Sequence, residues 1–245
     1  ETDGEFSTEL FQKYQRSEQA LVLTIMEMVV IGVSTRKITT ITEELCGRSF
    51  SKSTVSALCA ALDPVVIAFR DRQLERRYPF VMADALYTKV RENGRIRSKG
   101  FMIAVGINEQ GFREILGFSC ADSETEAGWT AFFRELKGRG LAQVDMVISD
   151  SHKGLVQAVK QCFQGATWQR CQTHFSRNML DVCPKKLHPE MKAALKSLYE
   201  AGDYETAILL RDSMLSRFQQ EAPKAAALLE AVSYTHLTLP TIYSV

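Results

Sequence analysis

Pro79-Phe-Val-Met-Ala-Asp-Ala-Leu-Tyr87 is the stretch that decides the fold, because it has the pattern of a buried β-strand with a carboxylate in its middle. Side chains alternate between the two faces of a strand, so Asp84 shares one face with Met82 and Leu86. Burying an ionised carboxylate costs free energy unless it is paired or bound to a metal ion. We therefore expect Asp84 to have either a partner or a function.

A second segment repeats this pattern later in the chain. Val144-Asp-Met-Val-Ile-Ser-Asp150 places apolar residues on one face and ends on an acid. Taken singly, Asp84 could be a partnered buried acid, and Asp150 could be the N-cap of the next helix. Two strands that each carry an acid predict one shared site formed by Asp84 and Asp150.

The order of elements after Tyr78 is strand, strand, strand, helix, strand, helix, strand. The first of these helices carries an apolar stripe at helical spacing, formed by Trp129, Phe132, Phe133 and Leu136. This order is typical of the ribonuclease-H-like fold, an α/β architecture with a mixed five-stranded sheet and flanking helices. Its first and fourth strands are neighbours, which predicts that Asp84 lies near Asp150. We expect this core to span residues 78–180.

Composition indicates an ordinary soluble chain of 245 residues, with 45% hydrophobic residues, 24% charged residues and a net charge of +1. Residues 34–100 hold a local basic excess of thirteen Lys and Arg against seven Asp and Glu. Neither a membrane span nor an export signal is recognisable, and six cysteines without a disulfide-like spacing suit a reducing compartment. We expect a cytoplasmic protein that does not bind membranes.

Residues 1–77 are expected to form a helical DNA-binding region and a linker. Helix, short helix, a turn with Gly47 and a further helix from Ser51 is the layout of a helix-turn-helix, whose last helix meets base edges with its first residues. The residues expected to contact double-stranded DNA are Arg36, Lys52, Ser53 and Thr54. The alternative is an ordinary group of three helices in which Ser51 is only an N-cap.

Residues 181–232 have a helical pattern rich in Ala and Leu, which we interpret as an incomplete helical insertion. The tail, residues 233–245, contains no Asp, Glu, Lys or Arg and breaks this pattern abruptly. We expect that tail to be non-native and exclude it from the fold.

Two neighbouring carboxylates suit Mg²⁺ or Mn²⁺, which prefer oxygen ligands and keep positions open for water and phosphate. Such a site predicts metal-dependent phosphodiester cleavage or transfer. His152, beside Asp150, and Cys171 and His174, which follow the fifth strand, are the residues that could support it. Alternatively, Cys171 and His174 could bind zinc together with Cys183 and His188, or Cys171 could simply pack in the core.

As a set, these segments resemble the Mutator-like transposases of bacterial insertion sequences, over about residues 5–232. The matching segments are Gly32-Val-Ser-Thr-Arg36, Ser51-Lys-Ser-Thr-Val-Ser56, Tyr78-Pro79, Asp84-Ala-Leu-Tyr-Thr-Lys-Val-Arg91, Glu114-Ile-Leu-Gly117, Leu136-Lys-Gly-Arg-Gly140, Ser149-Asp-Ser-His-Lys-Gly-Leu155 and Cys171-Gln-Thr-His-Phe-Ser-Arg-Asn178. The resemblance implies an Asp-Asp-Glu transposase that cuts and joins transposon ends with Mg²⁺. Asp84 and Asp150 would be its first two catalytic acids and metal ligands, and the complete protein would act as a homo-oligomer.

The sequence departs from this family in one respect. The family's third acid, a Glu, lies on a helix well downstream of the second Asp, and this chain stops first. Five downstream glutamates lack the expected context: Glu190, Glu200, Glu205, Glu221 and Glu230. We therefore expect this chain to be inactive as it stands. The alternative function is a non-catalytic DNA-binding protein on a ribonuclease-H-like scaffold.

Overall fold

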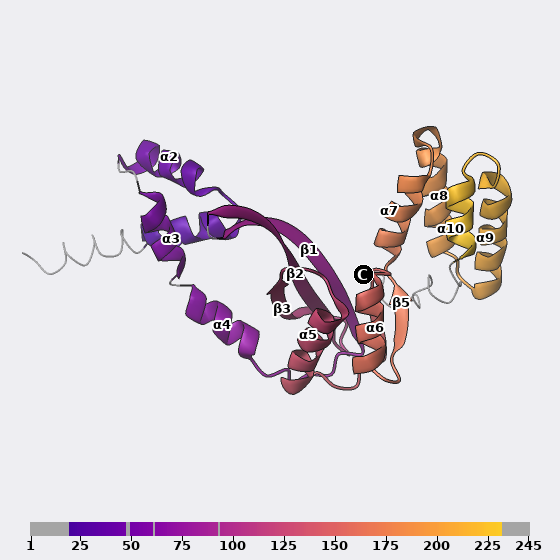
Figure 1. Cartoon of the computed structure of the whole chain (residues 1–245), viewed down its shortest axis with the longest axis horizontal. Coiled ribbons are helices and arrows are strands. Elements are labelled where there is room, and N and C mark those ends of the chain that lie inside the picture. Colours follow the sequence, from indigo (N-terminus) through magenta and orange to yellow (C-terminus); the bar gives the residue numbers. More distant parts are fainter. Residues whose placement is uncertain (1–19, 48–49, 61, 93, 232–245) are drawn as a thin grey trace, which may run out of the picture. The chain divides into compact units, whose positions relative to one another are not determined.

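The computed structural model describes residues 20–47, 50–60, 62–92 and 94–231 (Figure 1). The expected tail at 233–245 lies outside these residues. Two compact units divide the chain, Glu1–Asp71 and Arg72–Val245, which we call the N-terminal and C-terminal units. The division falls six residues before the boundary expected at residue 77.

Short helices make up the described part of the N-terminal unit. After a helix over Ala20–Val30 come α2 (Thr35–Cys46), α3 (Lys52–Ala60) and α4 (Asp63–Asp71). Helix α2 starts at an N-cap serine whose side chain accepts from a backbone N–H, and it ends at Gly47 in the left-handed conformation (φ 64°). Ile25, Ile38 and Val55, one from each of the first three helices, are fully buried and form a small core.

The C-terminal unit is built on a five-stranded sheet in the order β3-β2-β1-β4-β5. Its strands are β1 (Phe80–Glu92), β2 (Arg95–Ile107), β3 (Arg113–Ala121), β4 (Met146–Ser149) and β5 (Thr167–Arg170). The first three strands pair antiparallel, while β4 is parallel to β1 and β5 is parallel to β4. This is the predicted ribonuclease-H-like topology, with the first and fourth strands adjacent.

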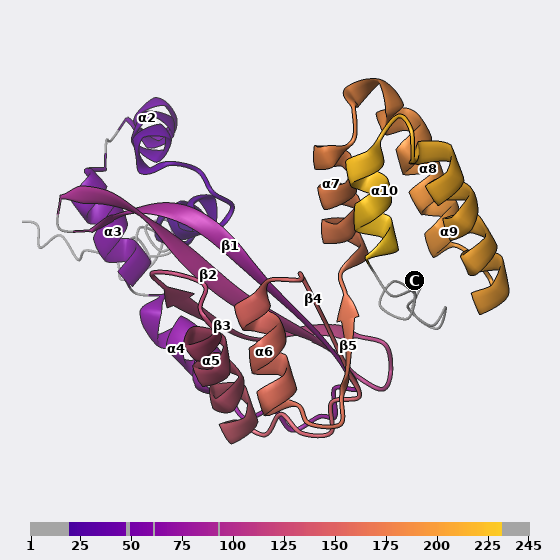
Figure 2. The ribbon, with the colours of Figure 1, turned by 45° about the vertical axis from the view of Figure 1, so that its right-hand side comes forward.

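Helices α5 (Glu126–Gly138) and α6 (Lys153–Cys162) lie side by side against one face of this sheet (Figure 2). The aromatic stripe predicted on α5 forms the centre of the core: Trp129 and Phe133 stack with ring centroids 5.5 Å apart, and Phe163 meets Phe133 edge-on at 5.1 Å. From the sheet, Val81 and Val147 reach the same core and are fully buried. Alternation along β1 and β4 then directs Asp84 and Asp150 to the other face.

A second core lies among the helices that follow the sheet. They are α7 (Gln172–Val182), a 3-10 turn at Lys185–Leu187, α8 (His188–Tyr199), α9 (Tyr204–Phe218) and α10 (Pro223–Glu230). Apolar residues from all of them, such as Phe175, Leu195 and Phe218, pack together away from solvent. Since α7 begins two residues after β5 ends, its first turn stands at the edge of the sheet where β4 and β5 end.

Candidate active site

The parallel register of β1 and β4 brings the two predicted acids together. The last pair in that register is Ala83 with Ser149, and both chains continue by one residue to Asp84 and Asp150. Neighbouring strands are about 4.8 Å apart, and paired residues of parallel strands point to the same face. The two carboxylates therefore lie next to each other on the face opposite α5 and α6.

Asp84 is more accessible than the sequence indicated. Its side chain is 44% exposed, whereas Val81 and Ala83, which point to the opposite face of β1, are buried. One carboxylate oxygen accepts the backbone N–H of Ala85, and an oxygen of Asp150 accepts that of Ser151 at 2.6 Å. The expectation of a buried carboxylate was wrong because α5 and α6 cover only the other face. Open carboxylates with spare lone pairs fit a hydrated divalent cation better than a closed site would.

Cys171 and His174 lie at the same edge of the sheet. The register of β4 with β5 ends at Ser149 and Arg170, so Cys171 follows in line with Asp150, and its N–H donates to the Ser149 carbonyl at 2.7 Å. One turn into α7, His174 Nε2 comes within 3.7 Å of an Asp84 carboxylate oxygen. Its Nδ1 is buried without a hydrogen-bond partner. His174 is thus the described side chain that links α7 to the first acid.

Arg170 is a residue of this site that sequence reasoning missed. Its guanidinium is nearly buried, lies 4.9 Å from the ring centre of Phe175, and donates to the Asn178 amide oxygen at 3.0 Å when that amide is oriented to satisfy both its ends. The Asn178 nitrogen then donates to the His174 carbonyl. Burial lowers the pKa of Arg170 from its usual value, and the negative charge of Asp150 opposes that change. Arg170 therefore connects the second acid to the helix that carries His174.

His152 points elsewhere. It occupies the N-cap position of α6, and its Nδ1 lies 3.6 Å from a carboxylate oxygen of Glu124. The same Glu124 oxygen accepts the indole N–H of Trp129, which is part of the core under α5. His152 therefore contacts a residue on the α5 side of the sheet. A role of His152 in supporting the two acids stays a prediction.

No third acid joins the pair in the part of the chain that the structure describes, where no group of three or more His, Cys, Asp or Glu is arranged to hold a metal ion. Glu190 and Glu221 are both bound by Arg217, at 2.6 and 2.8 Å. The alternative zinc site is not formed either. Its fourth member, His188, contacts the Cys183 carbonyl through Nε2 at 3.0 Å.

The residues predicted to contact DNA lie in the N-terminal unit. Arg36, Ser53 and Thr54 are exposed on α2 and α3, while the Lys52 side chain lies outside the described part. The Ser51 hydroxyl accepts the Thr54 N–H at 3.1 Å and also contacts the hydroxyls of Ser53 and Thr54. Ser51 is therefore an N-cap of α3, which both interpretations of these helices allow.

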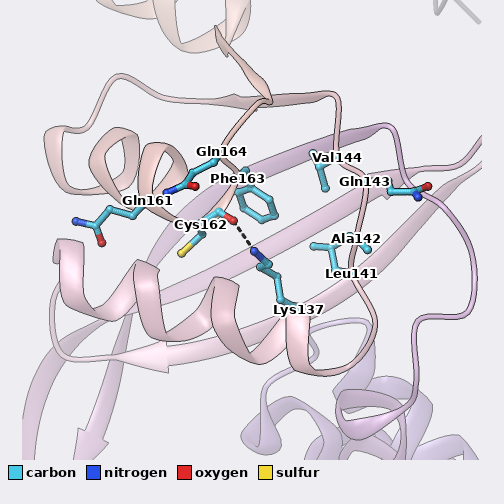
Figure 3. Close-up of a pocket in the computed structure, with 9 residues that line it drawn as sticks. All are labelled: Lys137, Leu141, Ala142, Gln143, Val144, Gln161, Cys162, Phe163 and Gln164. Atoms are coloured by element: carbon cyan, nitrogen blue, oxygen red, sulfur yellow. Dashed lines mark hydrogen bonds between the residues drawn. The ribbon is translucent and has the colours of Figure 1, made fainter.

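A separate hollow of about 430 Å³ opens at the other end of β4 (Figure 3). It lies between the ends of α5 and α6 and the segment at residues 141–144 that leads into β4, and Lys137 crosses it to donate to the Cys162 carbonyl at 2.8 Å. Since β4 separates this hollow from Asp150, about 13 Å away along four residues of strand, the hollow is not part of the acid site.

One apolar stretch among the described residues, Ser53–Asp71, is long and apolar enough to cross a membrane, although its window includes residue 61, which lies outside them. Only 6% of that window is buried. A single such stretch is weak evidence for a membrane protein, because helices of soluble proteins can have the same length and composition.

Comparison with known proteins identifies the family. The family model described as "Transposase, Mutator family" matches residues 1–241. The chain belongs to the Mutator family of transposases. This confirms the resemblance recognised from the sequence segments around Asp84, Asp150 and Cys171.

Individual Mutator-family relatives are close in sequence. The transposase for insertion sequence element IS256 in transposon Tn4001 of Staphylococcus aureus is 46% identical over 231 residues, 93% of this chain and 59% of that protein. The transposase for element ISRM5 of Rhizobium meliloti is 44% identical over 96% of this chain and 59% of its own length. The IS1081 transposase of Mycobacterium tuberculosis is 40% identical over 90% of this chain and 54% of its own length. The chain thus spans less than two thirds of the relatives it matches.

Solved structures add little to this assignment. The HTLV-2 integrase catalytic core domain, solved in complex with magnesium, aligns with 52% of this chain and 88% of that chain, at 14% identity and a TM-score of 0.26. A TM-score this low is too weak to support a structural relationship. The fold of this Mutator-family chain is therefore assigned from its strand order and register.

Proposed function

We propose that this chain carries two of the three catalytic acids of a DNA transposase that cuts and joins the ends of a bacterial insertion sequence. The observation that carries the proposal is the β1–β4 register, which sets Asp84 beside Asp150 on an open face of the sheet. Membership of the Mutator family and relatives that are named insertion-sequence transposases support it.

Asp84 and Asp150 would hold Mg²⁺ or Mn²⁺ through their carboxylate oxygens. Two neighbouring carboxylates fit such an ion because it keeps several water molecules and takes further oxygens from a phosphate group. When bound, the cation would stabilise the negative charge that develops during displacement at phosphorus.

His174 and Arg170 would act on the acids rather than on the DNA. His174, 3.7 Å from Asp84, limits the positions that this carboxylate can take. Arg170 contributes positive charge near Asp150 and fixes the first turns of α7 through Asn178. Cys171, in line with Asp150, would support the same edge through its backbone N–H.

The third acid would come from a part of the complete transposase that this chain does not span, since no described Glu joins Asp84 and Asp150 in a metal-binding group. By itself, we expect the chain to bind double-stranded DNA through Arg36, Lys52, Ser53 and Thr54 without cutting it. The complete protein would act in the cytoplasm as a homo-oligomer, because joining two transposon ends needs two sites held together.

Strand cleavage and joining test this proposal. Residues 1–231 would be fused to the remaining C-terminal segment of the Staphylococcus aureus relative and assayed on the end sequences of its IS256 element in Mg²⁺ or Mn²⁺. Asp84→Asn and Asp150→Asn each remove one charge with little change of shape. Asp181→Asn, which removes an exposed carboxylate from α7, is the matched control.

We expect the fusion and its Asp181→Asn variant to cut and join DNA, and both site variants to lose activity while binding DNA as before. Cutting that survives Asp84→Asn or Asp150→Asn would refute the assignment of the acids. A fusion that binds the ends and never cuts would favour the alternative, a DNA-binding protein on a ribonuclease-H-like scaffold.

A further inference from the structure

The hairpin of β1 and β2 extends beyond the rest of the sheet. These strands pair along their whole length, from Phe80 with Ile107 to Glu92 with Arg95. In contrast, β4 pairs with β1 only as far as Ala83, and β3 pairs with β2 only from Gly100 onward. Residues 88–92 and 95–99 therefore form a two-stranded ribbon, visible in Figure 1 where β1 and β2 run on together. We call residues 88–99 the basic ribbon.

Cations dominate this segment. It contains five Lys and Arg, namely Lys89, Arg91, Arg95, Arg97 and Lys99, against the single acid Glu92. All except Lys99 are exposed, and Lys99 meets the exposed carboxylate of Asp122 at 3.1 Å. Charged side chains on an exposed ribbon also prevent edge-to-edge aggregation, but charges of either sign would do this. Protection against aggregation therefore does not explain why five of the six charges are positive.

Three of the five cations share a face with Asp84. Directly paired residues of antiparallel strands point to the same side, and side chains alternate along each strand. Counting in steps of two from Asp84, the pairs on this face join Lys99 to Thr88, Arg97 to Val90 and Arg95 to Glu92. Lys89 and Arg91 fall on the opposite face. Leu86, between Asp84 and this row, is 59% exposed, so the face remains open along the way.

The spacing of the row suits a nucleic-acid backbone. At about 3.3 Å per residue, the path along β1 from Asp84 to the positions opposite Lys99, Arg97 and Arg95 is about 13, 20 and 26 Å. One strand of B-DNA presents a phosphate about every 3.4 Å along its axis. The cations thus match phosphates about four to eight base pairs from a phosphodiester held at Asp84.

We propose that the Asp84 face of the basic ribbon binds the phosphate backbone of double-stranded DNA about four to eight base pairs from the scissile position. This inference rests on the proposed function, to which it adds a substrate-binding surface outside the N-terminal unit. The ribbon fixes the direction in which the duplex leaves the acids, and a two-stranded ribbon is also narrow enough to enter a major groove.

Salt-dependent binding of the full chain to a 30-base-pair duplex tests the proposal. Fluorescence anisotropy would be measured from 50 to 200 mM salt in EDTA, so that binding is observed without cleavage. Arg95→Gln with Arg97→Gln removes two cations from the Asp84 face. Lys89→Gln with Arg91→Gln removes the same charge from the other face of the same ribbon, which makes it the matched control. Circular dichroism and Tm would confirm that both variants fold.

Each lost phosphate contact lowers the slope of log K against log salt by about 0.9. For the Arg95 and Arg97 variant we expect the steepness of this slope to decrease by about 1.8. Between 50 and 200 mM salt, the affinity of this variant should therefore fall about 12-fold less than that of the wild type. In the Lys89 and Arg91 control variant, the slope should change by less than half as much. An unchanged slope, or equal changes in both variants, would overturn the proposal. Wild-type protein that binds no duplex at all would refute the proposed function itself.

Discussion

Replacing Gly154 with alanine should weaken the packing of α6 against α5. A Cβ atom at residue 154 would lie 2.7 Å from the backbone nitrogen of Glu126 and 3.2 Å from the carbonyl carbon of Thr125. Backbone atoms at the start of a helix cannot rotate away as a side chain can, so the two helices must separate. Such overpacking costs about 1–3 kcal/mol, while alanine gains about 1 kcal/mol over glycine inside a helix.

The expected result is a net loss of up to about 2 kcal/mol in the free energy of unfolding, measured by urea denaturation. In a unit of this size that corresponds to a fall in Tm of up to about 8 °C. Because α6 begins three residues after Asp150, the same change should reduce cleavage by the fused protein described above.

Gly138→Ala is the control for this experiment. Gly138 is the last residue of α5, and a Cβ there would meet no atom within 4 Å. Alanine at that position should leave stability unchanged or raise it by about 0.4–1 kcal/mol. If Gly154→Ala proved as stable as Gly138→Ala, the close approach of α6 to the first turn of α5 would be wrong.

Two further predictions concern contacts that hold the sheet and α5. Burial and the Glu114 carboxylate, which accepts the Tyr78 hydroxyl at 2.6 Å, raise the pKa of Tyr78 to about 12. Because this folded pKa exceeds the usual 10, the associated stability is present below pH 10 and lost as pH rises through 12. Relative to Tyr78→Phe, the wild type should therefore lose up to about 3 kcal/mol in the free energy of unfolding between pH 10 and 12 in urea titrations. An equal pH dependence of stability in both proteins would contradict this. Thr125→Ala should cost about 0.5–2 kcal/mol, because the Thr125 hydroxyl accepts the Gly128 N–H at the start of α5. Thr125→Ser should restore that stability, and equal losses in both variants would exclude a capping role.

The sheet order and the position of the two acids could be predicted from sequence because both depend on local patterns. Apolar alternation marks the strands, and the aromatic spacing from Trp129 to Leu136 marks α5. Once the order of elements is known, the adjacency of the first and fourth strands follows, and with it the pairing of Asp84 with Asp150.

Other features depend on which surfaces meet in three dimensions. The sequence indicated a strand at residues 79–87, but β1 continues to Glu92 and pairs with β2 through the basic ribbon, where no apolar alternation marks a strand. The exposure of Asp84 reflects the position of α5 and α6 on a single face. Arg170 contacts Asn178 on α7 by a hydrogen bond, and no residue spacing in the sequence predicts that contact.

The parallel pairing of β1 with β4 also has a consequence for the order of folding. The hairpins of the first three strands close over a few residues, whereas Phe80 meets Met146, 66 positions later in the chain. Closing that longer loop costs about 2 kcal/mol more in chain entropy than closing a five-residue one. During synthesis the three-stranded meander can therefore form first, and Asp84 acquires its neighbour only when β4 has left the ribosome and docked. The pair of acids is in this way assembled only when the sheet is nearly complete.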